Sequence, residues 1–237
     1  MASDAIYVGA YWGSRPEGVE PCASRLRRCL VALAAVSPVF DHWRPKGRTR
    51  SEAVGAEEVE ASHLADALRR GVNRRDVDGS LIEKLGYSWS AWNGQSSSPS
   101  ALSVTCGASA SAAGVLNSFV LELPRPSNAG ASVLYERPTV IEAVLAITNA
   151  WEPSFAVVTS HRLRESRDRK PGQPVLGWIT YLASDRSVPQ SLAGFDVLPV
   201  AGGTVVALAR DWEGVLGADV ETLEDMLDRS GALTPIV

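Results

Sequence analysis

Cysteine and histidine are scarce in this sequence, with three of each among 237 residues. The cysteines, Cys22, Cys29 and Cys106, are an odd number without metal-ligand spacing, which indicates reduced structural thiols of a cytoplasmic protein. No two histidines have the helical spacing of paired zinc ligands. We therefore expect no metal site and no other cofactor.

Long apolar runs and the motifs of several enzyme classes are also absent. The longest apolar run, CLVALAAV at residues 29–36, is well short of the roughly 20 residues that span a bilayer. The opening residues, MASDAIYV, lack the charged and apolar regions of a signal peptide. The sequence has no G-x-S-x-G motif, no glycine-rich phosphate loop and no dinucleotide-binding fingerprint. These absences predict a cytoplasmic protein without membrane contact and weaken the case for an enzyme.

An excess of basic residues is missing as well. The formal net charge is −4 and the isoelectric point is near 5.5, which argue against direct binding to nucleic acid. The apolar share of 45% and the charged share of 21% are those of an ordinary globular protein. We expect a single domain over residues 1–237, with a subdivision near 125–137 as the alternative.

The spacing of apolar residues predicts a mixture of helices and strands. Between Val19 and Val36 they recur at steps of three and four, which predicts a long amphipathic helix. Further helices are expected over 56–70, within 71–86, over 138–151 and over 218–229. Strand-like runs cover 5–12, 87–94, 101–107, 117–124, 155–160, 177–183, 195–200 and 204–209. This order predicts an α+β fold, with mixed or mostly antiparallel sheets flanked by about four to five helices. An organisation of these elements into two similar halves is an alternative.

Tryptophan, in contrast, is plentiful, with seven residues. Four are expected in the core: Trp12, Trp89, Trp151 and Trp178. Trp43 stands between polar neighbours and is expected to be an exposed anchor for a protein partner, because tryptophan is enriched at binding hot spots. Trp92 is out of phase with Trp89 and is expected to be exposed in the same way.

The polar segment GVNRRDVDGSLIEKLG (71–86) contains Asp76-x-Asp78-Gly79, an order faintly similar to that of a calcium-binding loop. We expect Asp76 and Asp78 to cap a helix or form a turn there, because further calcium ligands at the required spacing are missing. His161 follows an apolar strand, where a hydrogen-bonding histidine is favoured over a catalytic one. A small hydrolase or nuclease-like enzyme that uses His161 and Asp76 as an acid–base pair is nevertheless the alternative function.

Five stretches of the sequence are informative when they are taken together: YVGAYWGSRPE (7–17), GVNRRDVDG (71–79), LGYSWSAWNG (85–94), WEPSFAVVTSHRLR (151–164) and PGQPVLGWITYL (171–182). Together, and in this order, they resemble the immunity protein 52 family of bacterial polymorphic toxin systems. Residues 183–237 carry no motif of that resemblance.

The resemblance implies a non-enzymatic antitoxin that is encoded beside a secreted toxin. The toxins of this family are typically nucleases with a restriction-endonuclease-like fold, some of them delivered by type VI secretion. The family positions matched here are Trp12, Asp76, Asp78, Trp92 and Trp178, and they serve either the fold or toxin contact. The aromatic stretch YVGAYWGSRPE is then expected to be scaffold more than binding site.

An inhibitor of a nuclease needs a surface that complements the basic groups with which a nuclease holds phosphates. Candidates are Glu57, Glu58 and Glu60 on the expected second helix, with Trp43 and Trp92 as anchors. A second group lies on the last helix: Glu221, Glu224, Asp225 and Asp228. A scaffold component of a secretion apparatus is a third hypothesis for the function.

Overall fold

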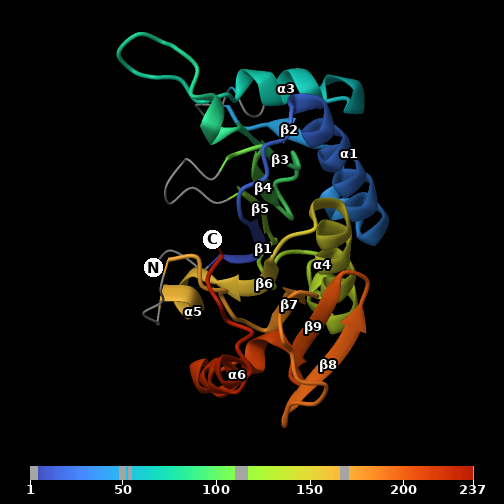
Figure 1. Cartoon of the computed structure of the whole chain (residues 1–237). Coiled ribbons are helices and arrows are strands. Elements are labelled where there is room, and N and C mark those ends of the chain that lie inside the picture. Colours follow the sequence, from blue (N-terminus) through green and yellow to red (C-terminus); the bar gives the residue numbers. More distant parts are fainter. Residues whose placement is uncertain (1–4, 48–51, 53–54, 110–116, 166–170, 237) are drawn as a thin grey trace.

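The computed structural model describes residues 5–47, 52, 55–109, 117–165 and 171–236, and one antiparallel sheet runs through it (Figure 1). Its nine strands have the order β2-β3-β4-β5-β1-β6-β7-β9-β8. They are β1 (Ile6–Trp12), β2 (Arg44–Pro45), β3 (Tyr87–Trp92), β4 (Ala101–Cys106), β5 (Asn117–Glu122), β6 (Phe155–Ser160), β7 (Ile179–Ala183), β8 (Phe195–Val200) and β9 (Gly203–Leu208). The α+β class predicted from the sequence is confirmed, and the described strands form one sheet.

Five α-helices accompany the sheet in the described part of the chain. They are α1 (Val19–Val36), α3 (Leu64–Arg70), α4 (Arg137–Trp151), α5 (His161–Glu165) and α6 (Gly217–Arg229). Pro138 stands in the first turn of α4, where its missing N–H breaks no helical hydrogen bond. None of these helices combines the length and the apolar character that a membrane crossing requires.

Alternate residues of the strands divide the core between the two faces of the sheet. On one face, α1 and α4 cover residues such as Val8, Phe119 and Val158. On the other face, α6 covers the C-terminal strands around Leu182 and Val206. β1 is buried along nearly its whole length because it pairs with β5 on one side and β6 on the other. The sequence of β1 is accordingly almost continuously apolar.

The N-terminal strands β3 to β5 are covered differently. Their inward side chains are apolar, as at Trp89 and Val104, whereas the outward ones include Ser88, Ser103 and Thr105 and are only half-buried. This alternation is that of an antiparallel sheet with one face on the core. It leaves the outer face of β3 to β5 partly open to solvent.

Two predicted helices differ from the structure. Residues 56–60 are not helical, and the helical part begins with a 3-10 turn at Ala61 before α3. The reason is tertiary, because the Val59 N–H bonds to the Trp43 carbonyl at 2.9 Å and holds this segment beside β2. Within 71–86 the helical part is a single 3-10 turn, Glu83–Leu85.

The buried face of α4 is not evident from its sequence. Ile141 and Leu145 are half-buried, whereas Val140 and Ile147 are buried. The helix is apolar on several sides, so its sequence alone did not determine which stripe faces the sheet. Trp151 at its C-terminus is fully buried, as predicted.

Candidate functional site

The family-matched Trp12 is a core residue. It is 2% exposed, and its ring stacks on that of Trp151 with centroids 5.2 Å apart and planes 22° apart. Phe119 continues the aromatic group at 6.1 Å from Trp151. The guanidinium of Arg15 lies 5.5 Å from the Trp12 ring, within cation–π range. The prediction that the opening stretch is scaffold is supported by this packing.

Two arginines join that opening stretch to the end of α4. Arg15 donates to the carbonyls of Trp151 at 2.5 Å and Glu152 at 2.7 Å, and Arg25 donates to that of Ala150 at 3.1 Å. Arg25 also pairs with Glu17 and Glu152, each at 3.1 Å. Cations are favourable at a helix C-terminus, where the last carbonyls have no helical partner. This arginine cluster therefore fixes α4 against the first strand and the first helix.

Trp178 is a second structural member of the family-matched set. It is fully buried, and its indole N–H donates to the Arg210 carbonyl at 2.7 Å. The ring of Trp212 meets it edge-on at 6.0 Å. Because its ring is buried and its N–H is hydrogen-bonded, Trp178 has the contacts of a core residue.

The two family-matched aspartates lie in an exposed turn between α3 and β3. The Asp78 carboxylate accepts from the Ser80 N–H at 2.9 Å and the Ser80 hydroxyl at 2.6 Å. These bonds, the one from the hydroxyl first, lower the pKa of Asp78 below its ordinary value. Gly79 closes the turn with φ +69°, a conformation that favours glycine. The turn role is confirmed for Asp78, whereas neither Asp76 nor Asp78 caps a helix.

The prediction that Trp43 is an exposed anchor is wrong. Its side chain is 4% exposed, and its indole N–H donates to the Phe40 carbonyl at 3.0 Å. A 3-10 turn over Pro38–Phe40 brings the chain round so that Trp43 enters the core beside Phe40. Trp92 is half-buried and lines a hollow of about 250 Å³ together with Glu122 and Arg125. Of the two tryptophans proposed as anchors, only Trp92 reaches the surface.

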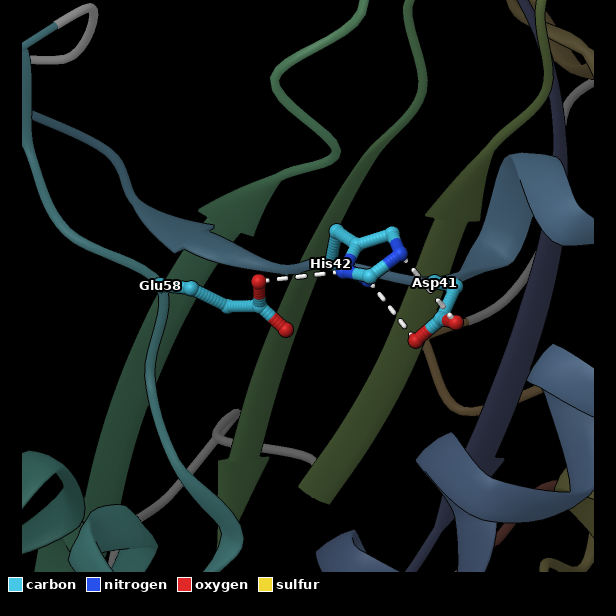
Figure 2. A group of neighbouring side chains, drawn as sticks. All are labelled: Asp41, His42 and Glu58. Carbon is cyan, nitrogen blue, oxygen red and sulfur yellow. Dashed lines mark hydrogen bonds and ion pairs between the residues drawn. The ribbon is translucent and has the colours of Figure 1, made fainter.

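The glutamates expected on a helix lie on the non-helical segment 56–60 instead, and they are exposed, as expected. We call the four carboxylates of this region the acidic patch: Asp41, Glu57, Glu58 and Glu60. Figure 2 shows two of them on either side of the imidazole of His42. Glu58 Oε2 lies 3.0 Å from Nδ1 and Asp41 Oδ2 lies 3.5 Å from Nε2. The acids proposed on α6 are a separate surface, of which Glu224 is half-buried and the others are exposed.

This histidine holds two acidic side chains in place. The hydrogen bond to Glu58, and then the charge of Asp41, raise the pKa of His42 above its ordinary value. His42 has φ +59°, and its own N–H donates to Asp41 Oδ1 at 2.8 Å. The contact with Glu58 spans sixteen residues, which is why sequence spacing gave no signal for it.

The same three side chains are the described group that comes nearest to a metal site. One ligand atom from each of Asp41, His42 and Glu58 lies within 4.8 Å of the others. The two carboxylates face different nitrogens of the ring, however, which suits an imidazolium that is hydrogen-bonded to Glu58 and ion-paired with Asp41 (Figure 2). A divalent cation would have to replace that proton and draw the carboxylates toward one nitrogen.

The chain is similar to known proteins in sequence and in fold. The family model for immunity protein 52 matches residues 4–236. The chain belongs to the immunity protein 52 family. Its fold is similar to that of the Pseudomonas aeruginosa T6SS protein PA0821, with a TM-score of 0.56 and 11% identity over 96% of this chain and 76% of that chain. No curated protein matches the sequence.

Family membership confirms the resemblance and extends it. The match includes most of residues 183–237, in which no motif had been recognised, and these residues supply β8, β9 and α6. In this immunity protein, the C-terminal segment therefore completes the sheet and covers its second face.

The acid–base pair of the enzyme hypothesis is not assembled. His161 begins α5 after β6, with its ring 5.2 Å from that of Tyr7, whereas the loop of Asp76 is bridged to β3 through Val72 and Tyr87. These strands are four positions apart in the sheet, which corresponds to about 19 Å. Figure 1 shows α5 and the loop between α3 and β3 well apart.

A hollow of about 470 Å³ lies near the end of α4. Its described lining includes Glu152, Asp185 and Tyr181 with small neighbouring residues, and contains no histidine, cysteine or lysine. Burial, followed by the nearby carboxylates of Asp185 and Glu152, raises the pKa of Tyr181. The tyrosine hydroxyl donates to the Gly202 carbonyl at 2.8 Å, which gives it a structural contact within the β8–β9 region.

Proposed function

We propose that this protein binds a cognate toxin as a stoichiometric complex and neutralises it in the cytoplasm of the producing cell. The observation that carries the proposal is the match to the immunity protein 52 family over residues 4–236. The finer part of the proposal is that the toxin is a nuclease with a restriction-endonuclease-like fold, delivered by a type VI secretion system. The fold shared with a T6SS protein supports that setting.

The acidic patch supports a nuclease as the partner. A nuclease presents basic groups to phosphates, and carboxylates on an inhibitor both attract that surface and compete with nucleic acid for it. Three of the four carboxylates lie on residues 57–60, a segment held by the Val59–Trp43 and Glu58–His42 bonds. A surface whose charges are held in advance loses less conformational entropy on binding. Trp92 is the remaining candidate anchor.

Co-expression with the toxin encoded by the adjacent gene tests the function. We expect growth to be rescued by this protein, and the purified pair to migrate as one complex of fixed stoichiometry. Addition of this protein to the purified toxin should abolish cleavage of DNA or RNA. Rescue that disappears in a folded His161→Ala variant while toxin binding persists would favour an enzyme instead.

A component of the secretion apparatus is the second candidate, since the similar solved structure is described as a T6SS protein. It predicts stable association with the secretion machinery in a strain that lacks the toxin gene. Affinity purification of the tagged protein from that strain separates the candidates. The immunity proposal expects no secretion component to be retained in the absence of the toxin.

A further inference from the structure

Residues 73–82 form a loop that projects from the end of the sheet near β3 (Figure 1). Its residues from Asn73 to Leu81 are all exposed. Val77, at the far end, is 97% exposed, the highest value among the large apolar side chains of the described residues. Leu81 adds a second apolar side chain, 47% exposed. Neither Val77 nor Leu81 belongs to the described hydrophobic core clusters, so core packing does not explain their apolar side chains.

The loop is held in shape by its own hydrogen bonds. The Arg75 N–H bonds to the Ser80 carbonyl at 2.9 Å, and Arg74 and Leu81 form an antiparallel bridge. Asp78 fixes the tip through its two bonds from Ser80. The loop is therefore ordered before any partner arrives, which reduces the entropic cost of binding.

The base of the loop is anchored on the edge of the sheet. The Ser88 N–H and hydroxyl both donate to the Gly71 carbonyl, at 3.1 and 2.8 Å. A Cβ on Gly71 would lie 1.6 Å from the Ser88 carbonyl oxygen, so only glycine permits this approach. The projection is thus connected rigidly to β3.

We propose that the 73–82 loop enters a concave surface of the bound toxin, with Val77 as the apolar tip, and so occludes the toxin's active-site cleft. This inference rests on the proposed immunity function. A convex, ordered element with an exposed apolar tip is complementary to a cleft, and clefts are where enzymes bind substrate. The loop carries Arg74 and Arg75 as well as Asp76 and Asp78, so polar side chains of both signs surround Val77.

Charge favours a toxin over a second copy of this chain as the occupant. The loop is bridged to Tyr87 at one end of β3, and the segment of the acidic patch lies beside β2, which pairs with Trp92 at the other end. The two ends are about 17 Å apart, which lies within one interface of standard size. A two-fold contact between copies on this edge would bring two acidic patches into one interface. A partner with basic groups instead meets the patch while the loop enters its cleft.

The test uses the full-length protein and the purified toxin from the adjacent gene. Val77→Asp places a charge at the tip without touching the core, and we expect it to weaken binding roughly 10- to 100-fold, mainly through faster dissociation. The matched control is Val31→Asp, because Val31 is a valine that is 66% exposed on α1 and does not belong to the loop. It should bind like the wild type, and both variants should melt close to the wild type.

A second variant removes the tip entirely. Residues 75–80 are replaced by Asn-Gly, a two-residue turn that joins the already paired Arg74 and Leu81. We expect this variant to fold, to bind more weakly and to lose inhibition of the toxin.

The outcomes distinguish a failure of this inference from a failure of the proposed immunity function. If the wild type neither binds nor inhibits the toxin, both the function and the inference are wrong. If the wild type and the shortened-loop variant inhibit equally well, the function stands and the inference is overturned. If Val77→Asp instead converts a dimer to a monomer in sedimentation and leaves toxin affinity unchanged, the loop joins two copies and the proposal is wrong.

Discussion

Replacement of Trp12 tests whether the most aromatic stretch of the sequence serves the fold. Trp12 is 2% exposed and stacked on Trp151, so Trp12→Ala leaves a cavity and ends the ring contact. Large-to-small changes of buried aromatics cost about 3–5 kcal/mol, and the stacked pair places this one near the upper end. For a chain of this length that loss corresponds to a fall in melting temperature of roughly 10–15 °C. Thermal melts followed by circular dichroism measure it directly.

The phenylalanine variant makes the same experiment sharper. Within the described residues the Trp12 indole N–H has no hydrogen-bond partner, so Trp12→Phe loses ring volume but also removes a buried unsatisfied donor. The two effects oppose each other, and we expect a net loss of only about 1 kcal/mol. Trp92→Ala, at a half-buried position, serves as the matched control with a smaller loss than Trp12→Ala. A Trp12→Ala variant that melts within about 2 °C of wild type would refute the scaffold assignment.

Three further predictions follow from the charged groups. Arg25→Ala removes the hydrogen bonds to the Glu17 carboxylate, the Ala150 carbonyl and the Glu152 carboxylate, and should lower the free energy of unfolding by about 2 kcal/mol. The exposed control Arg28→Ala should change the melting curve little. Replacing the three glutamates of the acidic patch by glutamines should slow toxin association and flatten its salt dependence in stopped-flow mixing. Because the pKa of His42 is raised in the folded state, its contribution to stability is complete below about pH 6.5 and is lost as the pH rises through the raised value. The difference in melting temperature between wild type and His42→Gln should therefore shrink toward alkaline pH, and a difference that grows instead would contradict the bonding shown in Figure 2.

Helices and strands were predictable from the sequence where the apolar residues lie on a single face of the element. Strand β3 alternates inward and outward side chains, and α1 has one apolar stripe, so both agree with the sequence. In α4, apolar residues occur on more than one side, and only the packing of the helix on the sheet selects Val140 over Ile141. The central place of β1 also could not be derived locally, because it depends on pairing with β5 and β6.

The candidate site was predictable in composition but not in arrangement. Glu58 was singled out as an exposed acid, yet its partner His42 is sixteen residues away. The contact depends on a non-helical segment that the sequence suggested was helical. Trp43 shows the same limitation, since its polar neighbours indicated exposure while the turn at Phe40 buries it. In both cases the contacts of the folded chain overrule the local pattern, across sixteen residues for Glu58 and through a short turn for Trp43.

The buried aromatic group and the projecting loop act at separate places, which makes their contributions independent. β1, which carries Trp12, and β3, which anchors the loop, are three positions apart in the sheet, or about 14 Å, and Val77 lies farther out. Sites at that separation without shared partners change stability and binding additively to within about 0.5 kcal/mol. The double variant Trp12→Phe with Val77→Asp should therefore melt like Trp12→Phe alone and bind toxin like Val77→Asp alone. A larger coupling in either measurement would mean that the loop depends on the core for more than a rigid base. Additivity, in contrast, would mean that the contact surface of this immunity protein can change while its scaffold stays the same.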